Sequence, residues 1–175
     1  MPDTASNAAP QAAPAPDAEL DQLIDSAAAS VQPETAEPDA ATPPVVSRCD
    51  VLIADDTGGS RELLAGILRN FAGPLQVREA RNGADALALW QQLRPSITLL
   101  DIDMPELDGL GALERIRALD AKAFVAIVSG GSNIDNVKRA LALGAAGFVI
   151  KPYKPQRIVD LLERYRELTG RSLTG

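Results

Sequence analysis

Five side chains whose oxygen and nitrogen atoms can do chemistry stand where apolar runs of this 175-residue chain end. Asp55 and Asp56 follow the first run, Asp101 a more central one, and Ser129 and Lys151 the last two. Three neighbouring carboxylates repel one another unless a cation lies among them, and a site with few oxygen ligands suits Mg²⁺. A lysine adds a movable positive charge and a serine hydroxyl donates a hydrogen bond, which together suit phosphoryl transfer. Asp101 is then the natural covalent acceptor.

Regular elements must bring these side chains together, and the sequence from residue 48 onwards predicts them. Short apolar runs predict strands at 51–54, 75–79, 97–101, 123–128 and 147–150. Apolar residues at helical spacing predict helices at 61–71, 84–93, 110–119, 134–143 and 156–168. This alternation is typical of an α/β domain with a five-stranded parallel sheet and helices on both faces. Parallel strands end at one rim, so we expect the five side chains there. An acidic rim that the lysine stabilises, without any chemistry, is the plainer alternative.

The start of the first predicted helix carries two further expectations. The helix at 61–71 has its apolar residues on one stripe, namely Leu64, Ile67, Leu68 and Phe71. The preceding Thr57–Gly58–Gly59 lacks the Lys-Ser/Thr ending of a phosphate-cradling loop. We expect these three residues to form a flexible entry beside the rim.

Composition restricts the chemistry further. The chain has no histidine, so histidine-based catalysis or a phosphate relay would need the histidine of a partner. The single cysteine, Cys49, excludes an internal disulfide and a cysteine-cluster metal site, and we expect it to be buried filler. The N-terminus lacks the basic and apolar parts of a secretory signal, and no apolar run approaches the roughly 20 residues that cross a bilayer. We therefore expect a cytoplasmic protein without membrane insertion.

The negative charge of the chain is concentrated in residues 1–47. This stretch holds eight of the 24 acidic residues and none of the 17 basic ones, so it accounts for the net charge of −7. The near-neutral remainder has no basic footprint, and we expect no direct binding to nucleic acid.

Residues 1–47 are also rich in Ala and Pro, a composition that predicts a disordered tail because too little apolar surface is available for burial. Residues 17–31 differ, because their apolar side chains recur at helical spacing. They predict a short helix that docks on a partner or on its own domain, and a weakly helical linker is the alternative. Pro43–Pro44 marks the boundary of a domain at 48–170, followed by a short tail at 171–175.

Four motifs stand in one order along this domain: LIADD, LLDIDMPELDG, VSG and GFVIKPY. In that order and at similar spacing they resemble the receiver domain of a bacterial two-component response regulator. The resemblance covers residue 50 to about residue 168. It implies a flavodoxin-like fold with the strand order 2-1-3-4-5.

The resemblance also implies a role for each acidic residue of the rim. Asp101 would be the phosphoacceptor. Asp56 would bind Mg²⁺ directly and Asp55 through a water molecule. The backbone carbonyl of Asp103 would complete the protein's share of the metal ligands, while an acidic side chain at this position would tune dephosphorylation in a direction that the sequence leaves open.

The remaining roles belong to residues within or directly after the fourth and fifth predicted strands. Lys151 would pair with Asp101 or with its phosphoryl group, and the Lys151–Pro152 peptide bond would be cis. Ser129 would be the switch hydroxyl that moves toward the phosphoryl group. Phe148 matches the switch aromatic residue, and ordinary core packing is its alternative role.

A phosphoacceptor switch, and not an enzyme, is the function that the resemblance implies. A histidine kinase or a histidine phosphotransfer protein would supply the phosphoryl group, and an unknown downstream protein would respond by protein–protein contact. Seven residues follow Leu168, so we expect no output domain in this chain.

Two alternative functions remain. Asp101–Ile102–Asp103 also resembles the DxD motif of haloacid-dehalogenase-type phosphatases, although in that family the acidic pair follows the lysine. Steady turnover of small phosphomonoesters would favour this alternative. The other is an interaction module that works without phosphorylation, although such receivers usually lack part of the acidic pair, the acceptor or the lysine, all of which are present here.

Overall fold

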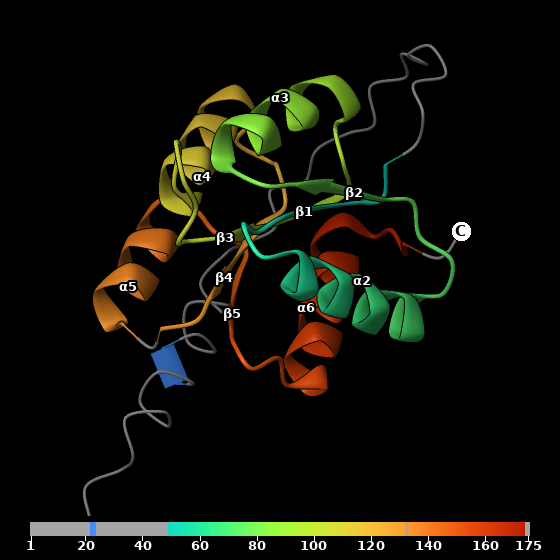
Figure 1. Ribbon diagram of the computed structural model, residues 1–175. Coiled ribbons are helices and arrows are strands. Elements are labelled where there is room, and N and C mark those ends of the chain that lie inside the picture. The colour runs from blue at the N-terminus through green and yellow to red at the C-terminus, as the bar shows by residue number, and fades with distance from the viewer. Residues whose placement is uncertain (1–21, 24–48, 132, 174–175) are drawn as a thin grey trace, which may run out of the picture.

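The computed structural model describes residues 22–23, 49–131 and 133–173 (Figure 1). Its strands are β1 (Val51–Ala54), β2 (Val77–Ala80), β3 (Ile97–Asp101), β4 (Val125–Ser129) and β5 (Gly147–Ile150). Its helices are α2 (Gly58–Ala72), α3 (Gly83–Leu93), α4 (Gly109–Leu119), α5 (Ile134–Ala142) and α6 (Pro155–Thr169). The predicted tail and its helix at 17–31 lie outside the described residues, except for Gln22 and Leu23, which are helical.

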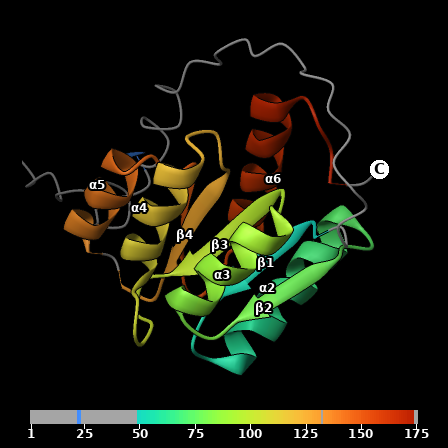
Figure 2. The ribbon, with the colours of Figure 1, turned by 90° about the horizontal axis from the view of Figure 1, so that it is seen from above.

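All five strands pair in parallel, in the order β2-β1-β3-β4-β5. The strands β2, β1, β3 and β4 can be followed side by side in Figure 2. The predicted fold class and strand order are therefore confirmed. Asp101, the last residue of β3, lies opposite Val128 of β4, and Ser129 at the end of β4 lies opposite Ile150 of β5. The carboxyl ends of the strands consequently form one rim.

Two apolar layers cover the two faces of the sheet (Figure 1). Leu52, Leu100 and Ile127 pack on one face with α3, α4 and α5, while the alternate strand residues pack on the other face with α2 and α6. Because both faces are buried, β1, β3, β4 and β5 are apolar at nearly every position, whereas the edge strand β2 carries the exposed Arg78 and Glu79. Among the described helices, none has the length and apolarity that crossing a bilayer requires. Cys49 is buried, as predicted.

The start of α2 differs from the prediction. Gly58 and Gly59 are not a flexible entry, because they form the first turn of the helix. Thr57 is extended and takes the N-cap position, and its carbonyl accepts a hydrogen bond from the backbone N–H of Arg61 at 3.2 Å. Helix propensity is a weak local preference, and here the packing of α2 on the sheet outweighs the low propensity of two glycines.

The predicted apolar stripe of α2 is only partly correct. Leu64 and Leu68 are buried, but Phe71 is 47% exposed. The buried arc of the helix is completed by Arg61, Ala65 and Ala72 instead. Because these residues shift the centre of the buried face to their own side of the helix, Phe71 lies at the margin of that face. The strand β2 also begins two residues later than predicted, because the N–H of Gln76 donates to the Asp50 carboxylate at 2.8 Å.

Candidate functional site

Three carboxylates converge at the rim of the sheet. One carboxylate oxygen from each of Asp55, Asp56 and Asp101 lies within 4.8 Å of the other two. Asp55 and Asp101 are 2% and 3% exposed, whereas Asp56 is exposed to solvent. The cluster of three carboxylates is therefore buried at Asp55 and Asp101 and open to solvent at Asp56.

Asp55 is held by the turn between β1 and α2. Its N–H donates to the Ala80 carbonyl at 3.2 Å, which continues the pairing of β1 with β2 by one residue. Its Oδ1 accepts a hydrogen bond from the N–H of Thr57 at 2.8 Å. The Thr57 hydroxyl donates to Asp56 Oδ1 at 3.1 Å. The two acids thus leave the strand in one tight turn but point their carboxylates to the same side.

Asp101 ends the central strand and is enclosed by the start of α4. A side chain at Gly109 would place its Cβ 2.1 Å from the Asp101 carbonyl oxygen, so this close approach requires glycine. Asp101 Oδ1 is buried and has no hydrogen-bond partner among the described residues. Burial raises the pKa of the Asp101 carboxyl, Lys151 lowers it, and Asp55 and Asp103 raise it again, so the pKa is higher than usual.

Lys151 lies between the two buried carboxylates. Its Nζ donates to Asp55 Oδ2 at 2.6 Å and forms an ion pair with Asp101 Oδ1 at 3.1 Å. Burial lowers the pKa of the Lys151 ammonium, but its contacts with Asp55 and Asp101 outweigh burial, so the pKa is raised. The Lys151–Pro152 peptide bond is cis, as the resemblance implied. Lys151 is thus closer to Asp55 than to Asp101, the partner that was expected.

Ser129 lies on the neighbouring strand with its hydroxyl engaged locally. It is 1% exposed, and its Oγ donates to the Gly131 carbonyl and accepts from the Gly131 N–H, both at 3.2 Å. Gly130 and Gly131, which follow β4, have open space where a Cβ would be.

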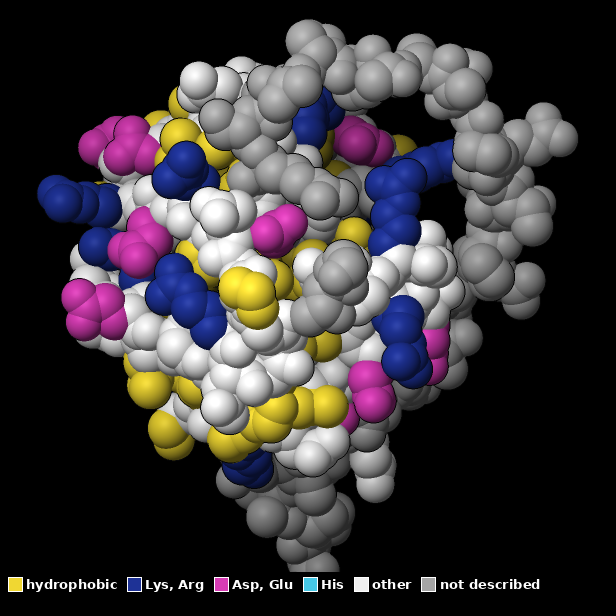
Figure 3. Space-filling view, turned by 90° about the vertical axis from the view of Figure 1, so that its right-hand side faces the viewer, with side chains coloured by type: hydrophobic (Ala, Val, Ile, Leu, Met, Phe, Trp, Pro, Cys, Tyr) yellow, Lys and Arg dark blue, Asp and Glu magenta, His cyan; other side chains and the backbone are white. Residues whose placement is uncertain are grey.

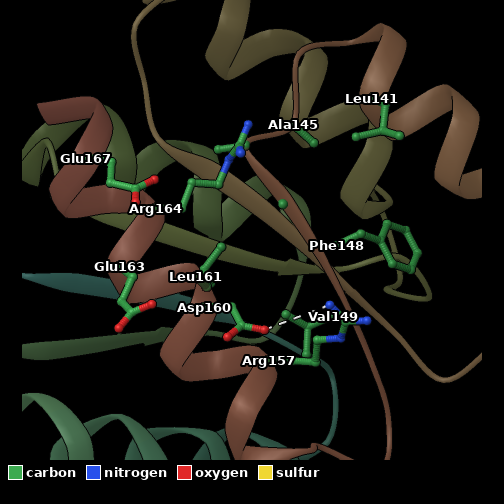
Figure 4. Close-up of a pocket in the computed structure, with 12 residues that line it drawn as sticks. Leu141, Ala145, Phe148, Val149, Arg157, Asp160, Leu161, Glu163, Arg164 and Glu167 are labelled. Carbon is green, nitrogen blue, oxygen red and sulfur yellow. Dashed lines mark ion pairs between the residues drawn. The ribbon is translucent and has the colours of Figure 1, made fainter. Parts of the chain in front are cut away.

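Phe148 lies on the β5 strand, three residues before Lys151, and is 3% exposed. It belongs to the core cluster on the face covered by α3, α4 and α5. It also borders a cavity of about 310 Å³ between α5, β5 and α6 (Figure 4). The residues that line this cavity do not include the carboxylates of the rim. Asp103 lies in the loop after β3 with an exposed side chain.

Three polar residues of the rim were not identified from the sequence. Thr57 and Arg61 bind the β1–α2 turn, and Tyr153 places a buried phenol close to Lys151 and Asp55. Burial raises the pKa of the Tyr153 phenol, and the Lys151 charge lowers it in part. The signal for Arg61 was available, because an arginine in the same helical arc as Leu64 and Leu68 must bury its guanidinium against a partner.

The donor set of the rim fits a divalent cation of the Mg²⁺ type. All candidate ligands are oxygen atoms, and Mg²⁺ binds few protein carboxylates and keeps several waters. Both Asp55 oxygens already accept hydrogen bonds, whereas Asp101 Oδ1 contacts the Lys151 ammonium in a longer ion pair and Asp56 faces solvent. The oxygens that remain for a cation therefore belong chiefly to Asp101 and Asp56.

The chain is similar in sequence and fold to known proteins. Residues 51–163 match the family model described as "Response regulator receiver domain". The chemotaxis protein CheY of Thermotoga maritima is 35% identical over 114 residues, which cover 65% of this chain and 94% of that protein. The receiver domain of NtrX from Brucella abortus superposes with a TM-score of 0.63 at 34% identity, over 69% of this chain and all of that one. CheY in a complex of CheX, CheY, BeF₃ and Mg²⁺ from Borrelia burgdorferi gives a TM-score of 0.59 at 27% identity, over 69% and 88% of the two chains.

Proposed function

Because the chain belongs to the response regulator receiver family, we propose that it is a phosphoacceptor switch with Asp101 as the acceptor. One observation carries the proposal: the buried Asp101 carboxylate forms an ion pair with Lys151 Nζ through Oδ1 at 3.1 Å and lies beside two further carboxylates. Three neighbouring carboxylates with one ammonium between them keep an excess of negative charge, which is unfavourable in a resting scaffold unless a further group binds there. A cation would balance that charge and would also bind the oxygens of a phosphoryl group.

The transfer step would begin with phosphohistidine of a histidine kinase or a histidine phosphotransfer protein. An Asp101 carboxylate oxygen attacks phosphorus, a P–O bond forms, and the N–P bond breaks with its electron pair left on the imidazole nitrogen of the donor. The Lys151 ammonium would remain beside Asp101 and balance the charge of the new phosphoryl oxygens. Since none of these 175 residues is a histidine, the phosphohistidine would lie outside them.

Asp55, Asp56 and Asp101, with the backbone carbonyl of Asp103, would hold Mg²⁺. When bound, the cation would neutralise the carboxylates and the phosphoryl oxygens that approach them. The convergence of three carboxylate oxygens within 4.8 Å supports this assignment, because such a cluster is repulsive without a cation.

The readout would be a change of surface that a downstream protein recognises. Shifting a switch from 1:99 to 99:1 takes about 5.5 kcal/mol of differential interaction. A charge-assisted hydrogen bond from Ser129 supplies only about 1.5–3 kcal/mol. Lys151 and repacking around Phe148 must therefore contribute. Phe148 lies on β5 and lines the cavity between α5, β5 and α6, the elements that would change.

Protein partners suit the surface of this domain. On the face shown in Figure 3, lysine and arginine side chains are interspersed with acidic ones, so the face offers charges of both signs to a partner.

We further propose that the domain spans residues 48–170, with tails at 1–47 and 171–175. Deleting residues 1–47 and measuring phosphotransfer and partner binding would test the tail, and no change in either would leave it a linker.

The experiment that tests the acceptor compares Asp101→Asn with Asp103→Asn. Both remove one negative charge from the same loop region, but only Asp101 is buried among the carboxylates. We expect Asp101→Asn to abolish Mg²⁺-dependent labelling by acetyl phosphate or by a phosphorylated kinase, and Asp103→Asn to remain labelled. Labelling of Asp101→Asn at the wild-type level would exclude Asp101 as the acceptor.

A further inference from the structure

The arginine at the start of α2 binds the peptide that joins the two acids of the β1–α2 turn. Arg61 is 9% exposed, and its Nη1 donates to the Asp55 carbonyl oxygen at 2.8 Å. Its Nε donates to Glu79 Oε2 on β2, also at 2.8 Å. One guanidinium therefore links α2, the end of β1 and the neighbouring strand β2. Arginine suits this task because its planar fork donates in several fixed directions.

This contact sets the direction of the chain at Asp56. The Asp55 carbonyl and the Asp56 N–H belong to one peptide unit, and such a unit is planar. Holding the carbonyl therefore also fixes the Asp56 nitrogen and restricts the position of its Cα. The side chain of Asp56 is exposed and accepts a hydrogen bond from the adjacent Thr57 hydroxyl, which belongs to the same turn. Its place beside Asp55 and Asp101 thus depends on the backbone.

Electrostatics makes this restraint necessary. The three carboxylate oxygens lie within 4.8 Å of one another, so repulsion drives the exposed Asp56 outward. Asp55 resists through its side-chain contacts with Lys151 and Thr57. For Asp56 the corresponding restraint is the peptide that Arg61 holds.

We propose that Arg61 is a positioning residue for the metal-binding carboxylates, acting through the Asp55 carbonyl on the peptide that presents Asp56. The inference rests on the proposed Mg²⁺ site. Glu79 has a subordinate part: its side chain is 41% exposed, so it orients the guanidinium from the solvent side and contributes little energy of its own.

Calorimetric titration with Mg²⁺ alone tests this role, on the full chain and its Arg61→Met and Glu79→Gln variants. Circular dichroism of each variant gives the folded fraction, to which the affinity is normalised. Arg61→Met keeps most of the apolar stem but removes both donors, and we expect Mg²⁺ binding about tenfold weaker or more, as when a group that orients a metal ligand is removed. Glu79→Gln leaves the carbonyl contact in place, and we expect a loss of about threefold or less.

The outcomes separate the possibilities. A folded Arg61→Met protein with wild-type affinity would overturn the proposal, as would an equal loss in Glu79→Gln, which would assign the effect to the ion pair. A wild type that binds no Mg²⁺ would remove the metal site itself. Should Arg61→Met not fold, the wild-type Arg61 Nε–H signal in NMR decides. It should shift on Mg²⁺ addition more than the signal of Arg94, the C-cap residue of α3, and an unmoved signal refutes the role.

Discussion

Replacing Lys151 by methionine would test whether the lysine neutralises the acidic rim. The substitution keeps an unbranched apolar stem and removes the ammonium that lies 2.6 Å from Asp55 and 3.1 Å from Asp101. Two buried carboxylates and the nearby Asp56 would then lack a counter-charge. At the 4.8 Å limit of their separation and an effective dielectric constant of about 20, a pair of carboxylates repels by about 3.5 kcal/mol.

The expected loss of stability follows from this exposure and geometry. Removing one partner of a buried ion pair costs about 3–5 kcal/mol. The Lys151 side chain is 22% exposed, so water relieves part of the penalty, and we expect a loss of about 2–3 kcal/mol in the absence of Mg²⁺. For a domain of this size that is a fall of roughly 10 °C in the unfolding midpoint.

Urea and thermal unfolding, followed by circular dichroism with a chelator present, measure this loss. Lys154→Met is the matched control, since Lys154 is exposed at the N-cap of α6, and its stability should stay within about 0.5 kcal/mol of wild type. Excess Mg²⁺ should restore part of the stability of Lys151→Met by binding the native state. A Lys151→Met protein as stable as wild type in chelator would refute the electrostatic reasoning.

Two further predictions concern the acceptor and its support. Because burial raises the folded-state pKa of Asp101, ionising it opposes folding, so Asp101→Asn should be more stable than wild type at pH 7. That difference should shrink as the pH falls through the raised pKa and vanish below the unfolded value of about 3.9; a constant difference in pH-dependent urea melts would contradict the argument. Gly109→Ala should lower the free energy of unfolding by about 1–3 kcal/mol, because the new Cβ would lie 2.1 Å from the Asp101 carbonyl oxygen. Gly66→Ala on α2 is the control: its Cβ would meet nothing within 4 Å, so the substitution should be neutral or stabilising. Equal losses in the two variants would contradict the argument from the close contact.

The positions of the strands and the rim were predictable because they depend on local patterns. Each apolar run ends at a polar residue, and a parallel sheet collects those ends whatever the details of packing. Asp55, Asp101 and Lys151 could therefore be placed near one another before any coordinates were available. Ser129 was placed on the same rim, but its hydrogen bonds to Gly131 were not predicted, because they depend on the shape of the loop.

The contacts between elements were harder to predict from the sequence, since they depend on how each helix is rotated about its axis over the sheet. Arg61 shares a helical arc with Leu64, but its two acceptors are a carbonyl of β1 and a carboxylate of β2, which no single stretch of sequence links. The same rotation leaves Phe71 at the edge of the buried face. The helical state of Gly58 and Gly59 was not predicted, because glycine has a low intrinsic helix propensity and tertiary packing outweighs it here.

The partners that Lys151 joins lie far apart in the order of synthesis. Asp55 and Lys151 are separated by 96 residues, and β5, which carries the chain to the lysine, is the last strand to leave the ribosome. A nascent chain therefore exposes its aspartates long before the ammonium that compensates them has been made. The negative charges of Asp55 and Asp101 are therefore compensated from within the domain only after β5 has been synthesised and has joined the sheet.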